Sequence, residues 1–129
     1  MKKHVFIVEK TETGFSSYAQ DFEKTPVATT GESLTELKDN IVEAFNLLQT
    51  HTGKKPVKAD DIVIQLDLEQ FFEYYKVINA KALGERIGMN QSLLSQYISG
   101  IKKPSHKQVE KIIGGIKQLG KELQELAFA

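Results

Sequence analysis

Residues 82–100 run Ala82-Leu83-Gly84-Glu85-Arg86-Ile87-Gly88-Met89-Asn90-Gln91-Ser92-Leu93-Leu94-Ser95-Gln96-Tyr97-Ile98-Ser99-Gly100, and this stretch decides the fold of the second half of the chain. Asn79 lies just before it, and an asparagine side chain caps a helix by accepting a hydrogen bond from a free amide two or three residues on. Leu83 and Ile87 form one apolar side of a short helix. Gly88 supplies the left-handed conformation that ends this helix without a Cβ clash. The stretch therefore predicts two helices joined by a tight turn, a helix-turn-helix.

The second of these helices starts at about Gln91, and its Leu94 and Tyr97 or Ile98 face back toward the first helix. Its outer side carries short amide and hydroxyl side chains, whereas a helix meant only for solubility normally carries Glu and Lys there. Amides and hydroxyls suit base edges in the major groove of DNA, where Gln pairs bidentately with adenine. Two lysines follow, where a phosphate backbone would run. The expected DNA contacts are Asn90, Gln91, Ser92, Ser95, Gln96, Ser99, Lys102 and Lys103. The alternative is an ordinary helical hairpin.

These residues also carry a family resemblance. Residues 79–108 resemble the helix-turn-helix of the Xre/Cro/phage-repressor type, and Ser95 to Ser105 is similar to the end of that group's recognition helix. Gly84 stands where these proteins usually have alanine, an exchange of one small residue for another. Leu93 occupies a position that is often polar and faces DNA, so it either packs inward or touches a thymine methyl.

The first half of the chain predicts a small sheet with one helix. Strands are expected at Val5–Val8, Phe15–Ala19, Thr25–Gly31 and Ile62–Asp67, from their β-favouring runs and turn residues. Ser33 and Glu36 form a capping-box pattern that opens a helix, and Gly53 to Pro56 ends it. The apolar stripe of this helix is Leu34, Leu37, Ile41, Ala44, Phe45 and Leu48. The predicted fold is therefore of the α+β class, with a βββαβ domain over residues 1–67 and an all-α helix-turn-helix domain over residues 68–129.

The βββαβ order, with Thr29-Thr30-Gly31-Glu32-Ser33-Leu34-Thr35-Glu36-Leu37 between the third strand and the helix, resembles the HicB antitoxin domain. That domain is a truncated relative of the ribonuclease H fold, and the resemblance covers residues 4–67. A Gly-Cys pair that family members often show near the third strand is missing here. The resemblance implies a type II antitoxin that neutralises a HicA-type messenger-RNA ribonuclease by direct binding. It also implies repression of its own operon by sequence-specific DNA binding.

Charge divides the chain as the motifs do. The chain has 17 basic and 17 acidic residues. Residues 1–79 hold nine Lys and thirteen Asp or Glu, a net charge of −4. Residues 80–129 hold seven Lys, one Arg and four Glu, a net charge of +4. This asymmetry indicates that the second half meets a polyanion and the first half something basic. The resemblance implies that the basic partner is a small basic toxin.

Localisation follows from what the composition excludes. The chain has no cysteine, which excludes a disulfide framework and a thiolate metal site. No apolar run approaches the roughly 18–20 residues that cross a bilayer. The apolar run before Glu9 has only four residues, Val5 to Val8, too few for a signal peptide. We therefore expect a cytoplasmic protein without a membrane partner.

No catalytic constellation stands out. Ribonuclease H chemistry needs carboxylates that converge on two metal ions, and the available ones are Glu9, Asp21, Glu23, Asp60, Asp61 and Asp67. They fall mainly at strand ends and in charged turns, which indicates solvated groups. His4, His51 and His106 have no ligand spacing among themselves. We therefore expect no enzyme, no catalytic residue, no metal and no cofactor. A one-component regulator that senses a small metabolite, and a degenerate or active nuclease, remain as alternatives.

The end of the chain predicts a last helix and a means of self-association. Residues 106–126 repeat apolar side chains at helical spacing, and Gly114, Gly115 and Gly120 interrupt them. Each glycine costs on the order of 1 kcal/mol against alanine in a helix, so they indicate a close backbone approach within the domain or across a dimer. The alternative is a final core helix with a frayed end. Since one helix-turn-helix covers only half a site on DNA, we expect a homodimer or higher homo-oligomer. The stripe from Ile112 to Leu126 is one candidate surface.

Overall fold

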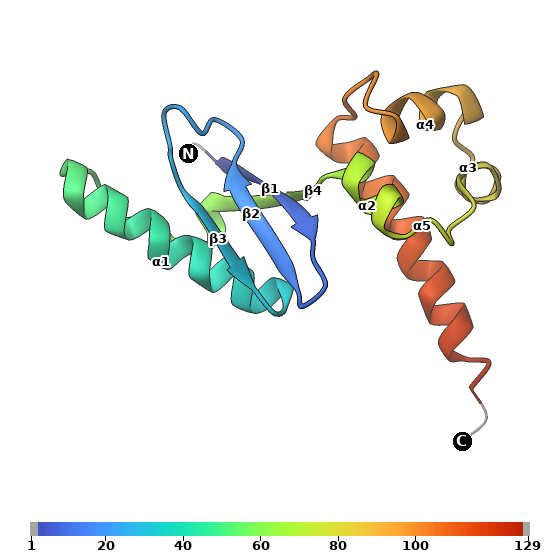
Figure 1. Cartoon of the computed structure of the whole chain (residues 1–129), viewed down its shortest axis with the longest axis horizontal. Coiled ribbons are helices and arrows are strands. Elements are labelled where there is room, and N and C mark those ends of the chain that lie inside the picture. The colour runs from blue at the N-terminus through green and yellow to red at the C-terminus, as the bar shows by residue number, and fades with distance from the viewer. Residues whose placement is uncertain (1–2, 128–129) are drawn as a thin grey trace. The chain divides into compact units, whose positions relative to one another are not determined.

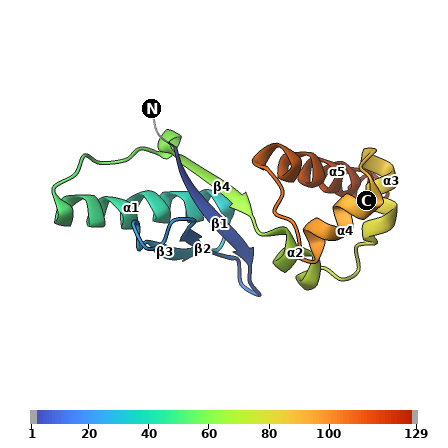
Figure 2. The ribbon, with the colours of Figure 1, turned by 90° about the horizontal axis from the view of Figure 1, so that it is seen from above.

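The computed structural model describes residues 3–127, and this part of the chain combines a four-stranded mixed sheet with five α-helices (Figures 1 and 2). The prediction of both a sheet and helices is confirmed. Met1 and Lys2, the first residues of the segment judged too short for a signal peptide, lie outside the described residues. The elements are β1 (His4–Lys10), β2 (Phe15–Ala19), β3 (Ala28–Gly31), α1 (Leu34–Thr52), a 3-10 turn η1 (Ala59–Asp61), β4 (Ile62–Leu66), α2 (Leu68–Tyr74), α3 (Ala80–Ile87), α4 (Gln91–Ile98) and α5 (His106–Gln124).

The chain divides into two compact units, Met1–Gln70 and Phe71–Ala129, called here the sheet unit and the helical unit. The boundary between the two units falls inside α2, whereas the sequence predicted a domain boundary after Asp67. Among the described residues, no helix has both the length and the apolar character that crossing a membrane requires.

The sheet has the strand order β3-β2-β1-β4. β1 pairs with β2 and β2 with β3 in antiparallel fashion, while β1 and β4 are parallel. β3 begins at Ala28 rather than at the predicted Thr25. The reason is local. The amide of Val27 donates to the carbonyl of Thr25 at 2.7 Å, and Pro26 has no backbone N–H that could donate a hydrogen bond to a neighbouring strand.

α1 lies along one face of the sheet and closes the core of this unit (Figures 1 and 2). Ser33 caps it by accepting from the amide of Glu36 at 3.1 Å, and the carboxylate of Glu36 accepts from the amide of Glu32. The stripe prediction is wrong for Leu34, which is 45% exposed at the first residue of the helix. The buried core is Phe6, Val8, Ala19, Val27, Leu37, Ile41, Phe45, Val57 and Ile62.

The glycines of α5 differ in what surrounds them. At Gly115 a Cβ atom would overlap Cγ2 of Ile87, so this glycine permits the close approach of α3 to α5. At Gly114 and Gly120 a Cβ would meet nothing within 4 Å. A close approach within the helical unit is therefore found at Gly115, where the side chain of Ile87 packs against the backbone of α5.

This difference makes a matched pair of variants. Gly115→Ala is expected to destabilise the chain by about 1–2 kcal/mol, because overpacking costs about 1–3 kcal/mol and better helix propensity returns part of it. Gly114→Ala is expected to stabilise by up to about 1 kcal/mol, since it gains propensity without a clash. Urea unfolding followed by circular dichroism measures both. Changes of the same sign in the two variants would contradict the close contact.

Candidate nucleic-acid interface

The α3–α4 pair is fixed by caps at both of its starts. The side chain of Asn79 accepts from the amide of Ala82 at 3.0 Å, as predicted, and that of Asn90 accepts from the amide of Leu93 at 3.2 Å. Gly88 adopts the predicted left-handed conformation, with a φ of 69°, and its amide donates to carbonyls of α3. The link between the helices is thus three ordered residues, 88–90, and it sets the start of α4 at Gln91.

Apolar residues from three helices hold this pair in place. Leu83 of α3 and Leu94 and Tyr97 of α4 are buried, and so are Val109 and Ile112 of α5. At Gly84, a Cβ atom would lie 3.2 Å from Cδ2 of Leu94. α3 and α4 therefore approach each other more closely at this point than an alanine would comfortably allow.

The amide and hydroxyl residues predicted to contact DNA lie along the outer side of α4 and at its two ends, but they differ in exposure. Gln91, Ser92, Ser95 and Ser99 are exposed, and Gln96 is half-buried. Leu93 is also half-buried, so the structure leaves both of its predicted roles open. The side chains of Gln91, Ser92 and Ser95 make no hydrogen bond to any described residue, which leaves their donors and acceptors turned to solvent.

Asn90 and Ser99 have local structural roles at the two ends of α4. The carbonyl oxygen of the Asn90 side chain is occupied by the cap, and the hydroxyl of Ser99 donates to the carbonyl of Gln96 at 3.3 Å. The groups that these two residues could still offer a ligand are the side-chain NH2 of Asn90, as a donor, and the hydroxyl oxygen of Ser99, as an acceptor. Of the predicted contacts, Gln91, Ser92 and Ser95 therefore have the most freedom to meet a ligand.

Lys81 is a residue that the sequence analysis missed. It lies in the first turn of α3 and lines, with Ala80, Gln91, Leu94, Ser95 and Ile98, a shallow hollow of about 180 Å³. A cation in the first turn of a helix opposes the helix dipole, which favours acidic residues there. This unfavourable position of Lys81 is the signal by which the sequence could have identified it, because a residue in a locally unfavourable position often binds a ligand.

The electrostatics of this surface favour an anion. Neither α3 nor α4 has an acidic residue in its first turn, so the amides at their N-termini meet no nearby carboxylate of their own helix. Lys102 and Lys103 are exposed just after α4, and the amide of Lys102 donates to the carbonyl of Gln96 at 3.2 Å. This bond keeps the two lysines at the C-terminal end of α4.

Arg86, the single arginine, is engaged elsewhere. Its guanidinium contacts the carboxylate of Glu122 on α5 at 2.7 Å. The hydrogen bonds from Arg86 and Gln118 hold the pKa of Glu122 below its usual value. Both partners are more than 40% exposed, so this pair is expected to add little stability. The exposed lysines of α5 face solvent: Lys107, Lys111, Lys117 and Lys121.

The carboxylates and histidines named as catalytic candidates do not assemble within the described residues. No group of three or more His, Asp or Glu side chains there is placed to hold a metal ion. Asp61 accepts from the amide of Lys58 at 2.9 Å, and Asp67 accepts from the amide of Gln70 at 3.2 Å, both as local caps. His4 packs its ring edge-on against Phe45, and His106 contacts Glu110.

Comparisons with known proteins give no support for a family: no protein-family model, no curated protein and no solved structure matches this chain.

Proposed function

We propose that the chain is an antitoxin of the HicB type that also represses its own operon, with α3 and α4 as a helix-turn-helix. The observation that carries the DNA-binding part is the outer side of α4. Gln91, Ser92 and Ser95 are exposed there and their side chains make no internal hydrogen bond, and Lys81, Lys102 and Lys103 flank this side. In this type of domain, the second helix enters the major groove with its N-terminal residues on base edges. Gln91, the first residue of α4, is the leading base-reading candidate.

The proposed division of labour follows the two units. The sheet unit, of the βββαβ HicB type, binds and occludes a small basic ribonuclease. The net charge of −4 over residues 1–79 suits this encounter, and inhibition of this kind needs no chemistry. The chain is then a cytoplasmic non-enzyme without a cofactor. It acts as a dimer on a two-fold operator, and Leu123 and Leu126, 57% and 65% exposed, are candidates for the contact between copies.

Operator binding tests the proposal directly. Lys102→Ala is expected to weaken binding to all DNA sequences and to lower the salt slope of log affinity by about one unit, because one phosphate contact is lost. Lys117→Ala, an exposed lysine of α5, is the matched control and should change the slope little. Fluorescence anisotropy on the upstream region, at several salt concentrations, measures both. Equal affinity for the upstream region and for unrelated DNA would contradict sequence-specific repression.

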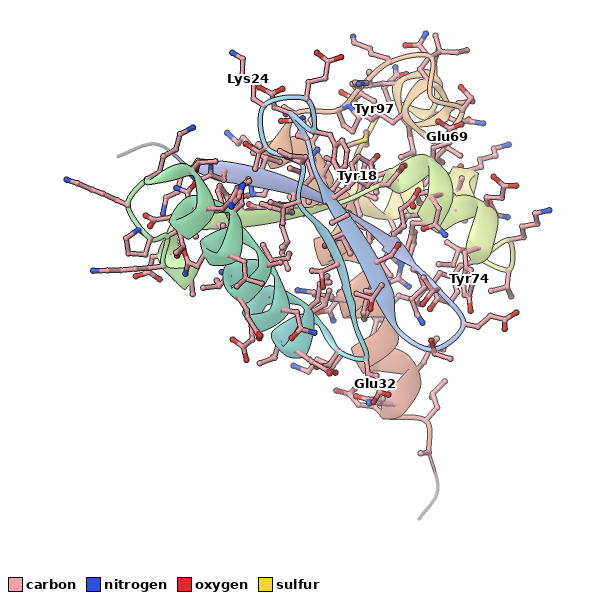
Figure 3. All side chains as sticks on the ribbon, turned by 60° about the vertical axis from the view of Figure 1, so that its left-hand side comes forward. Tyr18, Lys24, Glu32, Glu69, Tyr74 and Tyr97 are labelled. Carbon is pink, nitrogen blue, oxygen red and sulfur yellow. The ribbon has the colours of Figure 1, made fainter. Side chains whose placement is uncertain are left out.

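A second candidate function is a one-component regulator that senses a small molecule. A cavity of about 380 Å³ in the sheet unit favours it, a size within the range of small-ligand sites. Lys3, His4, Lys24 and Lys54 outnumber one carboxylate, Asp21, in the lining of this cavity. Lys24 projects from the connection between β2 and β3 (Figure 3). These groups suit an anionic metabolite. Release from the operator on adding such a metabolite, with no toxin neutralised, would favour this candidate over the antitoxin.

A further inference from the structure

The two faces of the sheet are covered differently within the sheet unit. α1 packs on the face that carries Phe6, Val8 and Ala19. The opposite face carries Val5, Ile7 and Val63, which are only partly buried, and Tyr18, which is 37% exposed. Apolar and aromatic side chains that stay accessible on one sheet face are typical of a surface that binds a partner.

The strand register brings two carboxylates to this face beside Tyr18. Tyr18 pairs with Ile7, and Glu9 lies two residues further along β1 on the same face. Asp67 follows the end of β4, where its amide donates to the carbonyl of Val8 at 2.8 Å. Burial, and then the charges of Asp67 and Glu9, raise the pKa of Tyr18 above its usual value. Both carboxylates therefore act on the hydroxyl of Tyr18, the residue labelled in Figure 3.

The charge on this face is of one sign. The charged residues that β1, β2, β3 and β4 with Asp67 place there are Glu9 and Asp67, both acidic. Lys10 points to the other face, where its ammonium lies 5.2 Å from the centre of the Phe15 ring. Within residues 3–127, neither Glu9 nor Asp67 has an ion-pair partner in its own unit. A cation placed beside them would gain a favourable charge contact with both.

We infer that the Tyr18 face, defined as Val5, Ile7, Glu9, Tyr18, Val63 and Asp67, is where the chain binds its basic protein partner. An Arg or Lys side chain of that partner lies over the Tyr18 ring, with its charge beside the carboxylates of Glu9 and Asp67, in a cation–π and ion-pair contact. Apolar side chains of the partner cover Val5, Ile7 and Val63. The inference rests on the proposed function for the identity of the partner, a small basic ribonuclease.

Charge and polarity separate this partner from other classes. A nucleic acid is repelled by two carboxylates without a cation beside them. A free metal ion leaves the apolar part of the face uncovered. A basic protein surface with apolar neighbours matches both parts, and complementary charge also speeds its encounter with the face.

The first experiment uses the full chain with 13C-labelled tyrosines and a hexaarginine peptide as the probe, at low salt. The chain has four tyrosines, so Tyr18 is observed beside internal controls such as the buried Tyr97. A saturable shift of the Tyr18 ring signals, with those of Tyr97 unchanged, is expected. The double variant Glu9→Gln/Asp67→Asn should bind the peptide about tenfold more weakly or worse, a loss of about 1.4 kcal/mol.

The matched control is Asp39→Asn/Glu43→Gln, which removes two exposed carboxylates from α1 and changes the net charge equally. It should bind the peptide as the unchanged chain does. No shift at Tyr18, or equal weakening in both double variants, would overturn the inference whatever the function is.

The second experiment repeats the series with the HicA-type ribonuclease of the same genome. Loss of binding in Glu9→Gln/Asp67→Asn but not in the control supports the Tyr18 face as the toxin site. Equal binding by both variants overturns the inference and leaves the proposed function intact. If the unchanged chain fails to bind the ribonuclease while the peptide still shifts Tyr18, the proposed function fails and the basic-partner surface stands.

Discussion

Replacing Gly31 with alanine is expected to destabilise the sheet unit by about 3 kcal/mol or more. A Cβ atom at Gly31 would lie 2.5 Å from the amide nitrogen of Leu37 and 2.6 Å from its Cα. These are backbone atoms of α1, so no side chain can rotate away, and the whole helix has to move off β3. Overpacking a core typically costs about 1–3 kcal/mol, and a backbone clash belongs at the upper end of that range or above it.

A glycine of the same unit supplies the control. Gly53 ends α1 in the left-handed conformation with φ of 70°, and a Cβ there meets nothing within 4 Å. Gly53→Ala should therefore lose only about 1–2 kcal/mol, the cost of that conformation for a residue with a Cβ. Chemical unfolding of both full-length variants measures the two losses. A loss at Gly31 no larger than at Gly53 would show that α1 does not rest on β3 as described.

Local signals in the sequence predicted most element starts and ends. Asn79, Ser33 and Gly88 act through atoms within a few residues of themselves, so their chemistry can be recognised without the rest of the chain. The start of β3 was harder to predict, because the segment from Thr25 to Val27 favours extended structure and bonds to itself. The exposure of Leu34 could not be predicted from the spacing of apolar residues, because this spacing does not show at which residue the helix stops contacting the sheet.

Such local signals could not predict contacts between segments that lie far apart in the sequence. Gly31 and Gly115 look like any glycine in the sequence, and only the packing of α1 on β3 and of α3 on α5 gives each its role. The Tyr18 face likewise depends on strand register, which brings Glu9 and Asp67 to one ring from two strands. The common exposed side of Gln91, Ser92 and Ser95 was easier to predict, because residues on one side of a single short helix are set by helical spacing alone. Lys81 was missed because it comes from the neighbouring helix.

The double replacement Gln91→Ala/Gln96→Ala is expected to lower operator affinity by about 100-fold or more. Each bidentate contact of an amide with a base is worth about 1–3 kcal/mol, and the two sites lie on the outer side of one helix. Neither glutamine belongs to the buried core, so the substitutions create no core cavity and folding should survive. Gln118→Ala/Gln124→Ala on α5, both exposed, is the matched control and should bind the operator normally.

The same variant tests whether the two activities are separable. If the sheet unit alone holds the basic partner, Gln91→Ala/Gln96→Ala should still neutralise the toxin at the stoichiometry of the unchanged chain. An operator-binding assay and a toxin-inhibition assay on one protein preparation, with circular dichroism to verify folding, give the answer. A folded variant that loses both activities equally would mean that the toxin contacts α4 itself. In that case DNA and toxin would compete for one surface. Free toxin would then release the operator because both ligands cannot bind α4 at the same time, and the two units would not act independently.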